Sequence, residues 1–270
     1  MTIETLITAK DKIDTSFLEN IELCTDAVVV NQCDRNDKFL SKTLSEKRIL
    51  FLCTTERGLS KSRNAAINNA TADICVLSDD GFIHINGYDK IVEEAYTAYP
   101  HADIITFQNV RHGKRVRNYS PQPYKHNIFT LLSVLSNEIT FRPESLKRVC
   151  IKFDEKFGED SVFEHGEEFV FLGECLKREL SIYYIPAPIG ALPEIRVSQL
   201  LTFDKNYFVS KGASFKAVGG FFAPVLSLYF AIGKFKAYRN QCSFFKALSY
   251  LSKGGRAYKK VLKKGIVPNG

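Results

Sequence analysis

Short apolar runs recur along the first 80 residues, and polar stretches long enough for a helix separate them. Continuous runs of this kind, rich in β-branched residues, are typical of strands that are buried on both faces of a parallel sheet. Their alternation with helical stretches predicts a doubly wound α/β sheet. We expect its first four strands at Glu4–Ala9, Asp26–Asn31, Arg48–Thr54 and Ile74–Ser78.

The stretches between and after these strands predict the remaining elements. Asn86-Gly87 is a turn signal that precedes an amphipathic stretch, and Pro143 suits the first turn of a helix. The basic segment Asn109–Pro123 is predicted as a solvated loop, with a phosphate-binding role as the alternative. The expected helices are Ile13–Asn20, Phe39–Leu44, Ser60–Ala70, Tyr88–Tyr99, one from Pro143 and one from Glu167, and the expected further strands are Ala102–Phe107 and Ile139–Arg142.

Two adjacent carboxylates, Asp79 and Asp80, stand directly after the fourth predicted strand. Open α/β sheets bind ligands at the carboxyl ends of their strands. Two like charges side by side repel each other, and hard oxygen ligands suit Mg²⁺ or Mn²⁺ shared with a diphosphate. The alternative is an ordinary Asp-Asp-Gly turn. The pair therefore indicates a candidate metal and phosphate site.

A basic residue, Arg63, lies at the start of the helix that precedes this strand, with Ser60 as a candidate N-cap. Helix N-termini attract anions, and a guanidinium adds a fork of donors there. An isolated arginine is more often a solvated surface charge. The order of basic turn, small-residue helix, apolar strand and acidic pair favours the anion-binding interpretation.

A second acidic cluster occupies Phe153–Leu180, where a glycine-punctuated loop precedes the predicted helix at Glu167. Glu167 and Glu168 would lie in its first turn, where the helix dipole favours anions. Simple helix capping explains such residues when they are taken alone. The other interpretation is a general base, since a carboxylate is needed to take the proton of an acceptor hydroxyl. Asp154 is a weaker candidate for a structural or acceptor-orienting role.

The composition is that of a globular protein, with 270 residues, 45% of them apolar and 25% charged. The seven scattered cysteines form no C-x-x-C pair, and the five histidines have no metal-ligand spacing. The cysteines are expected to be small buried hydrophobes in a reducing compartment. The first residues resemble no signal peptide, and no apolar run reaches the roughly 20 residues of a membrane span. We therefore expect a cytoplasmic protein.

The charge is unevenly distributed along the chain. Residues 205–270 carry 13 Lys and Arg and no acid, whereas residues 1–204 carry 24 bases and 30 acids. Ser214–Lys236 is strongly apolar, and a basic amphipathic stretch follows it. Such a tail is typical of an interfacial anchor on anionic lipid. Nucleic acid is a less suitable partner, since phosphates offer nothing to an apolar run. The remaining alternative is a pair of helices packed on the catalytic domain.

The segment GLSKSRNAAINNATADICVLSDD, residues 58–80, resembles family 2 glycosyltransferases of the GT-A fold, including those of bacterial capsule and O-antigen synthesis. FDEKFG and HGEEFVFL, within Phe153–Leu172, resemble that family's base-bearing motif. The resemblance implies an inverting transfer from a UDP- or GDP-sugar, with Mn²⁺ or Mg²⁺, to a lipid-linked saccharide acceptor at the inner face of the membrane. It also implies a nucleotide-sugar-binding half at 1–100, an acceptor-binding half at 101–204 and the tail at 205–270. The implied site residues are Thr8, Gln32, Asp34, Arg63 and Asp79 for the nucleotide sugar, Asp79 and Asp80 for the metal, and Glu167 or Glu168 as the base.

Two rival interpretations remain. Many relatives have a third acid where this chain has Gly81, and often a late histidine that the region Ile189–Glu194 lacks. The chain could therefore be a catalytically silent nucleotide-sugar binder or partner subunit. A phosphatase with an Asp pair would need a nucleophilic aspartate after the first strand, and the run ETLITAK contains none.

Overall fold

The computed structural model describes residues 1–111, 114–115, 118–191 and 202–264. The chain forms two compact units. The first comprises Met1–Arg57, Lys61–Lys152 and Cys175–Glu194, and the second comprises Gly58–Ser60, Phe153–Glu174 and Ile195–Gly270. Each is described by itself below, and the predicted three-part division stays a prediction.

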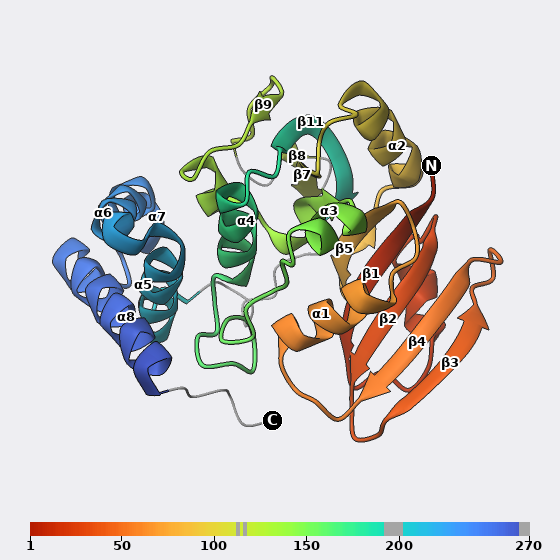
Figure 1. The fold of residues 1–270 in the computed structure, drawn as a ribbon, viewed down its shortest axis with the longest axis horizontal. Coiled ribbons are helices and arrows are strands. Elements are labelled where there is room, and N and C mark those ends of the chain that lie inside the picture. Colours follow the sequence, from red (N-terminus) through yellow and green to blue (C-terminus); the bar gives the residue numbers. More distant parts are fainter. Residues whose placement is uncertain (112–113, 116–117, 192–201, 265–270) are drawn as a thin grey trace. The chain divides into compact units, whose positions relative to one another are not determined.

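The first unit is built on one mixed sheet, in which the described strands follow the order β3-β4-β2-β1-β5-β10-β7-β11-β6. Strands β4, β2, β1 and β5 are mutually parallel and lie side by side in Figure 1. Strand β8 pairs with β7, and β9 pairs with β11. The strands are β1 (Ile3–Lys10), β2 (Asp26–Gln32), β3 (Asp37–Lys42), β4 (Arg48–Thr54), β5 (Ile74–Asp79), β6 (Ile83–His84), β7 (Ile104–Arg111), β8 (Lys114–Arg115), β9 (Tyr124–Lys125), β10 (Ile139–Phe141) and β11 (Ile182–Ala191).

Helices cover the sheet because its strands alternate their side chains between two faces. On one face, Ile7 and Val29 pack with Leu18 of a 3-10 turn, and farther along Val76 packs with Val92 of α2. Helix α1 belongs to the stretch between β4 and β5. The helical elements of this unit are η1 (Ser16–Asn20), α1 (Leu59–Asn69), α2 (Tyr88–Ala98), η2 (Thr130–Ser133), η3 (Ser136–Glu138), α3 (Pro143–Arg148) and the end of α4 (Glu167–Lys177).

The α/β class and the central sheet flanked by helices are confirmed, but the sheet is mixed and only its four strands β4, β2, β1 and β5 form a parallel block. Of the predicted helix Ile13–Asn20, only Ser16–Asn20 is helical, as the 3-10 turn η1. A second predicted helix is wrong. Phe39–Leu44 was expected to be helical, but Asp37–Lys42 forms the edge strand β3, antiparallel to β4. Side chains on β3 alternate between more and less exposed positions, which is a strand period, and Phe39 stacks on Phe51. A six-residue polar segment gains more from pairing with an existing sheet edge than from an isolated helical turn.

Two further expectations need correction or fall partly outside the described residues. The predicted loop Asn109–Pro123 begins inside β7, which continues to Arg111 and pairs with β8. Residues 112–113 and 116–117 of that segment, and residues 192–201 with the end of Ile189–Glu194, lie outside the described part of the chain. All seven cysteines are thiols, and five of them are buried as expected, whereas Cys24 is half-buried and Cys150 is exposed.

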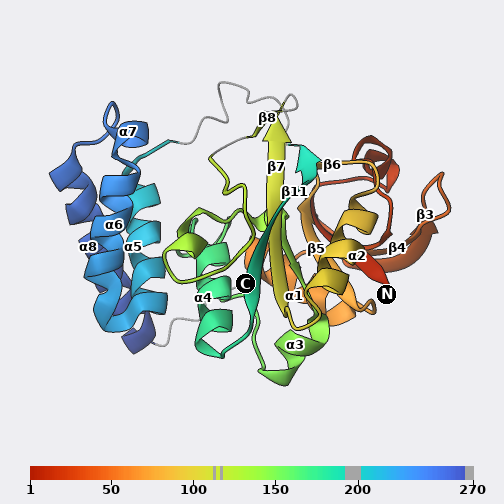
Figure 2. The same ribbon diagram turned by 90° about the horizontal axis from the view of Figure 1, so that it is seen from above.

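The second unit is mainly helical, and Figure 2 shows α5, α6 and α8 side by side. Helices α5 and α8 approach closely because Gly212 faces the backbone of Leu251 and Gly254 faces that of Val209. Helix α6 folds back on α5, with the Phe215 and Phe230 rings 5.3 Å apart. Its elements are the start of α4, α5 (Lys205–Gly219), η5 (Gly220–Phe222), α6 (Ala223–Gly233), α7 (Phe235–Tyr238) and α8 (Phe244–Lys264).

Within the described residues, one helical stretch, Lys205–Gly233, is long and apolar enough to cross a membrane by length and composition, with a mean hydropathy of 1.6. Gly220 interrupts it with a φ of 51°, and the chain turns there between α5 and α6. A third of the most apolar window is buried inside the protein. The stretch therefore combines a packed helix, α5, with a more exposed one, α6.

Candidate functional site

The acidic pair lies beside the point where the order of the strands in the sheet reverses. Strand β1 has β2 on one side and β5 on the other, so a topological switch point lies between β1 and β5. Thr8 and Asp79 are register partners across it, and the Thr8 hydroxyl donates a hydrogen bond to Asp79 Oδ1 at 2.8 Å. This is the edge at which α/β sheets bind their ligands.

Asp79 also faces a cation. Arg63 Nη2 lies 3.5 Å from Asp79 Oδ1, and the arginine side chain is only 3% exposed. The Ser136 hydroxyl donates to Asp79 Oδ2 at 3.4 Å. A nearly buried guanidinium requires a compensating charge, so the interpretation of Arg63 as a solvated surface charge is wrong. Its predicted contact with the nucleotide stays a prediction.

The start of the helix that carries Arg63 differs from the expectation. Helix α1 begins at Leu59, so Arg63 lies in its second turn rather than its first. Ser60 is not the N-cap, since its hydroxyl donates to the carbonyl of Phe157 at 2.6 Å. The helix N-terminus is therefore not what brings Arg63 to Asp79.

Asp80 pairs with a lysine that the sequence analysis did not single out. Lys12 Nζ lies 2.8 Å from Asp80 Oδ2, and both side chains are about one-third exposed. Buried Asn31 clamps the Lys12 backbone, accepting from its N–H at 3.0 Å and donating to its carbonyl at 2.7 Å. Asn31 of β2 thus holds the loop that follows β1 in place. That loop places the Lys12 ammonium beside Asp80.

The fit to a divalent cation can be judged from the donor set. Among the described residues, no group of three or more His, Cys, Asp or Glu side chains converges on one point. Asp79 and Asp80 supply hard oxygen donors, and Mg²⁺ commonly uses one or two carboxylates with phosphate and water. The pair therefore suits a cation whose coordination a diphosphate completes, and it does not form an all-protein cage.

The other predicted nucleotide contacts lie near the ends of β1 and β2. Gln32 is the last residue of β2 and is buried. Its backbone carbonyl accepts a hydrogen bond from Arg57 Nη1 at 3.1 Å. Asp34 is exposed in the turn that follows. The register pairs Gln32 with Lys10 of β1, so this edge is continuous with that of Thr8.

An aspartate that a phosphatase could use does follow the first strand. Strand β1 ends at Lys10, and an aspartate, Asp11, follows it directly. Its carboxylate lies 3.5 Å from Arg57 and is 64% exposed. Asp11 therefore forms a surface ion pair at the end of the strand, which gives it no feature of an activated nucleophile.

The second acidic cluster belongs to the second unit. Helix α4 begins at Glu167 as predicted, directly after Gly166 with a φ of 102°. A side chain at Gly166 would clash with Ser214, so the turn into the helix requires glycine. Glu167 is buried, with 7% exposure, whereas Glu168 is partly exposed.

The surroundings of Glu168 are polar and charged. Burial lowers the pKa of His165, and Lys211 lowers it further, while the negative charge of Glu168 opposes both effects. Burial also raises the pKa of Tyr207, and the negative charge of Glu168 raises it further. Glu168 thus lies in a polar part of the second unit, near His165 and Tyr207.

Sequence reasoning missed Lys12, the contact of Asn31 with the Lys12 backbone, and Ser136. A polar loop directly after a predicted strand was the available signal for Lys12 and Asn31. Ser136 had none, because it reaches Asp79 from a 3-10 turn 57 residues away.

Comparisons with known proteins give a consistent fold. No family model matches the chain, and no curated protein matches it. TarS residues 1–349 from S. aureus superpose with a TM-score of 0.57 at 13% identity, covering 100% of this chain and 93% of that one.

Two ligand complexes are similar as well. TarS with UDP-GlcNAc gives a TM-score of 0.59 at 13% identity, with the same coverage. The mannosyltransferase PcManGT from Pyrobaculum calidifontis, with GDP-Man and Mn²⁺, gives 0.55 at 15% identity, covering 98% of this chain and 76% of that one. These likenesses establish the glycosyltransferase-type α/β fold that the sequence predicted.

Proposed function

We propose that this chain is a glycosyltransferase that takes its sugar from a nucleoside diphosphate sugar. The observation that carries the proposal is the cluster of Thr8, Arg63 and Asp79 at the switch point of the sheet. Similar folds have been solved with UDP-GlcNAc and with GDP-Man and Mn²⁺. The combination of this fold with an acidic pair at its ligand-binding edge favours a diphosphate ligand.

In this proposal the donor lies across the ends of β1, β2 and β5. Gln32 and Asp34 contact the base or ribose, and Lys12 and Arg63 stabilise negative charge on the leaving diphosphate. Asp79 and Asp80 would hold a divalent cation, Mn²⁺ or Mg²⁺, which supplies Lewis-acid stabilisation of that charge when bound.

The transfer itself needs a base, and we assign this role to Glu168. Its carboxylate is partly exposed, whereas that of Glu167 is buried and less able to reach an acceptor. Glu168 takes the proton of the acceptor hydroxyl while the new C–O bond forms. The bond from the anomeric carbon to the diphosphate breaks in the same step, which inverts that centre.

The composition of the tail supports a proposal for the acceptor and the location. We propose a lipid-linked saccharide acceptor of surface polysaccharide synthesis, with the protein peripheral on the inner face of the membrane. Helix α6 exposes apolar side chains, and residues 205–270 carry 13 bases and no acid. Basic and apolar surface together favour anionic lipid over nucleic acid as the partner.

The test is nucleotide binding followed by turnover. UDP or GDP with Mn²⁺ should raise the melting temperature of the wild-type protein, and Asp80→Asn should abolish the metal-dependent part of that rise. Glu94→Gln, which removes an exposed carboxylate on α2, serves as the matched control. An unchanged metal response in Asp80→Asn would show that the site assignment is wrong. Glu168→Gln should bind donor normally and lose transfer by a factor of about 10² or more.

A silent nucleotide-sugar binder is the second candidate, and one observation favours it. Asp80 pairs with Lys12 and Asp79 with Arg63, so the acidic pair is already compensated by two cations. Binding of UDP- or GDP-sugars without hydrolysis or transfer, across a panel of donors with Mn²⁺, would support this candidate.

A further inference from the structure

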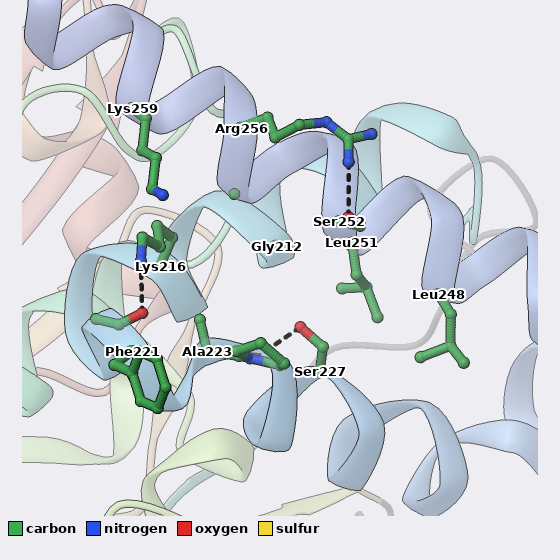
Figure 3. Close-up of a pocket in the computed structure, with 13 residues that line it drawn as sticks. Gly212, Lys216, Phe221, Ala223, Ser227, Leu248, Leu251, Ser252, Arg256 and Lys259 are labelled. Atoms are coloured by element: carbon green, nitrogen blue, oxygen red, sulfur yellow. Dashed lines mark hydrogen bonds between the residues drawn. The ribbon is translucent and has the colours of Figure 1, made fainter.

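The second unit contains a pocket that is separate from the residues assigned to sugar transfer. It has a volume of about 400 Å³ and lies among α5, η5, α6 and α8. Figure 3 shows Leu248 and Leu251 of α8 on one side, and Lys216 and Lys259 toward the opposite end. The pocket thus has an apolar end and a cationic end.

The cations are held in position but retain donors. Lys216 Nζ donates to the Gly220 carbonyl at 2.6 Å, and Arg256 Nη1 donates to the Ser252 hydroxyl at 3.0 Å. An ammonium has three N–H donors and a guanidinium has five, so each has capacity for an anion. The lining contains no Asp or Glu, and Lys259 adds a third positive charge. The lining of the pocket is therefore cationic and can attract an anion.

The open side of the pocket is apolar and exposed. Phe221 lines the pocket and is 91% exposed. Phe222, Val225 and Ile232 of η5 and α6 are exposed as well, by 70%, 53% and 61%, and on α6 they lie on a different side from the pocket-lining Ala223, Pro224 and Ser227. Large exposed apolar side chains of this kind mark a surface that is covered by lipid or protein. The cationic lining beside Phe221 favours lipid, because it fits a phosphate.

We propose that this pocket binds the phosphate group of a single membrane lipid. Lys216 and Lys259, which lie at the same end of the pocket, bind the phosphate, Arg256 adds positive charge to the lining, and the acyl chains leave past Phe221. The inference concerns the helical unit alone and holds whether or not the chain transfers sugars. It adds a defined lipid site to the general attraction between a basic surface and a membrane.

The experiment uses a tryptophan reporter, because the chain contains no Trp. Full-length Phe221→Trp is titrated with dihexanoyl phosphatidic acid below its micelle concentration, so no charged surface is present. A saturable blue shift of the fluorescence is expected. Inorganic phosphate and dihexanoyl phosphatidylcholine at equal concentration should produce no comparable shift.

Two matched triple variants in this background make the test specific. Lys216→Gln/Arg256→Gln/Lys259→Gln should bind more than about tenfold more weakly, since it loses the charge-assisted contacts of the two lysines and the remaining positive charge of the lining. Lys236→Gln/Arg239→Gln/Lys246→Gln removes the same charges outside the pocket lining and should stay within about threefold of the parent. Circular dichroism verifies that both variants are folded.

Each other outcome overturns the proposal. Equal weakening in both triple variants would mean that only the net charge matters. An equivalent shift with inorganic phosphate would mean a site for a free anion. Displacement of the lipid by a single-stranded oligonucleotide at lower concentration would assign the surface to nucleic acid, and absence of any saturable shift would leave the pocket without a lipid ligand.

Discussion

The ammonium of Lys12 lies 2.8 Å from the carboxylate of Asp80, at the place where a divalent cation is expected to bind. A lysine and a metal ion compete for the same carboxylate oxygens. Lys12→Gln should therefore bind Mn²⁺ more tightly in the absence of nucleotide, by roughly fivefold, since an ion pair that is about one-third exposed contributes at most about 1 kcal/mol. Titration with Mn²⁺ by calorimetry or electron paramagnetic resonance measures this affinity.

The matched control is Lys90→Gln, which removes an exposed lysine of α2. It should leave the Mn²⁺ affinity unchanged. If Lys12→Gln binds Mn²⁺ no better than the wild type, Asp80 is not a metal ligand in the free protein. Weaker nucleotide binding by Lys12→Gln would further assign its ammonium to the diphosphate.

Gly81 is the position at which a third acid can be restored. A Cβ at Gly81 meets nothing within 4 Å, so a side chain fits there without rearrangement. Gly81→Asp should raise the Mn²⁺ affinity about tenfold, because it adds a third hard oxygen ligand beside Asp79 and Asp80. Gly81→Asn has the same shape without the charge and should have little effect. Equal affinities for the two variants would indicate that position 81 does not face the cation.

The sequence predicted the parallel centre of the sheet because burial determines it. Arg48–Thr54, for example, is largely apolar between its polar ends, and the observed strand β4 has the same limits. Strand β3 could not be recognised, since an edge strand is half solvated and its pattern depends on pairing with β4.

The candidate site was predictable only where its residues follow a strand. Asp79 and Asp80 were found because the carboxyl end of a buried strand has a known functional meaning. Ser136 could not be found, since its contact with Asp79 is created by tertiary folding. The pairing of Lys12 with Asp80 depends on the Asn31 clamp, which is likewise a property of two neighbouring strands and of no single segment.

His84 should make the stability of the first unit depend on pH. It is 1% exposed, its Nε2 is 3.1 Å from the Ser78 hydroxyl, and its ring stacks on Tyr88. Burial lowers the pKa of His84 from 6.5 to about 4. Below pH 6.5 the unfolded chain therefore binds a proton that the folded chain excludes, so stability falls as the pH decreases from 6.5 to 4. The slope approaches about 1.4 kcal/mol per pH unit.

The measurement is the unfolding free energy from urea titrations at several pH values, compared with His84→Gln. Other titrating groups, including His165, are common to both proteins and cancel in the difference. The wild type should lose roughly 2–3 kcal/mol relative to His84→Gln between pH 6.5 and 4. His101→Gln, which removes an exposed histidine, should follow the wild-type profile. Parallel profiles for wild type and His84→Gln would mean that His84 is protonated in the folded state.

Gly212 gives a test of the helical unit in which two physical effects have opposite signs. Helix propensity alone predicts that alanine in place of a helical glycine stabilises the protein, by up to about 1 kcal/mol. At Gly212, however, a methyl group would meet the backbone carbonyl of Leu251, and α5 and α8 would have to separate. Overpacking against backbone costs about 1–3 kcal/mol, so we expect Gly212→Ala to unfold at a lower temperature than the wild type. Gly233→Ala, at the end of α6 where nothing lies within 4 Å, should be neutral or slightly stabilising in the same thermal unfolding experiment. A Gly212→Ala variant as stable as Gly233→Ala would mean that α5 and α8 lie farther apart than the structure places them. The pocket would then lose the close contact between its lining residues Gly212 and Leu251.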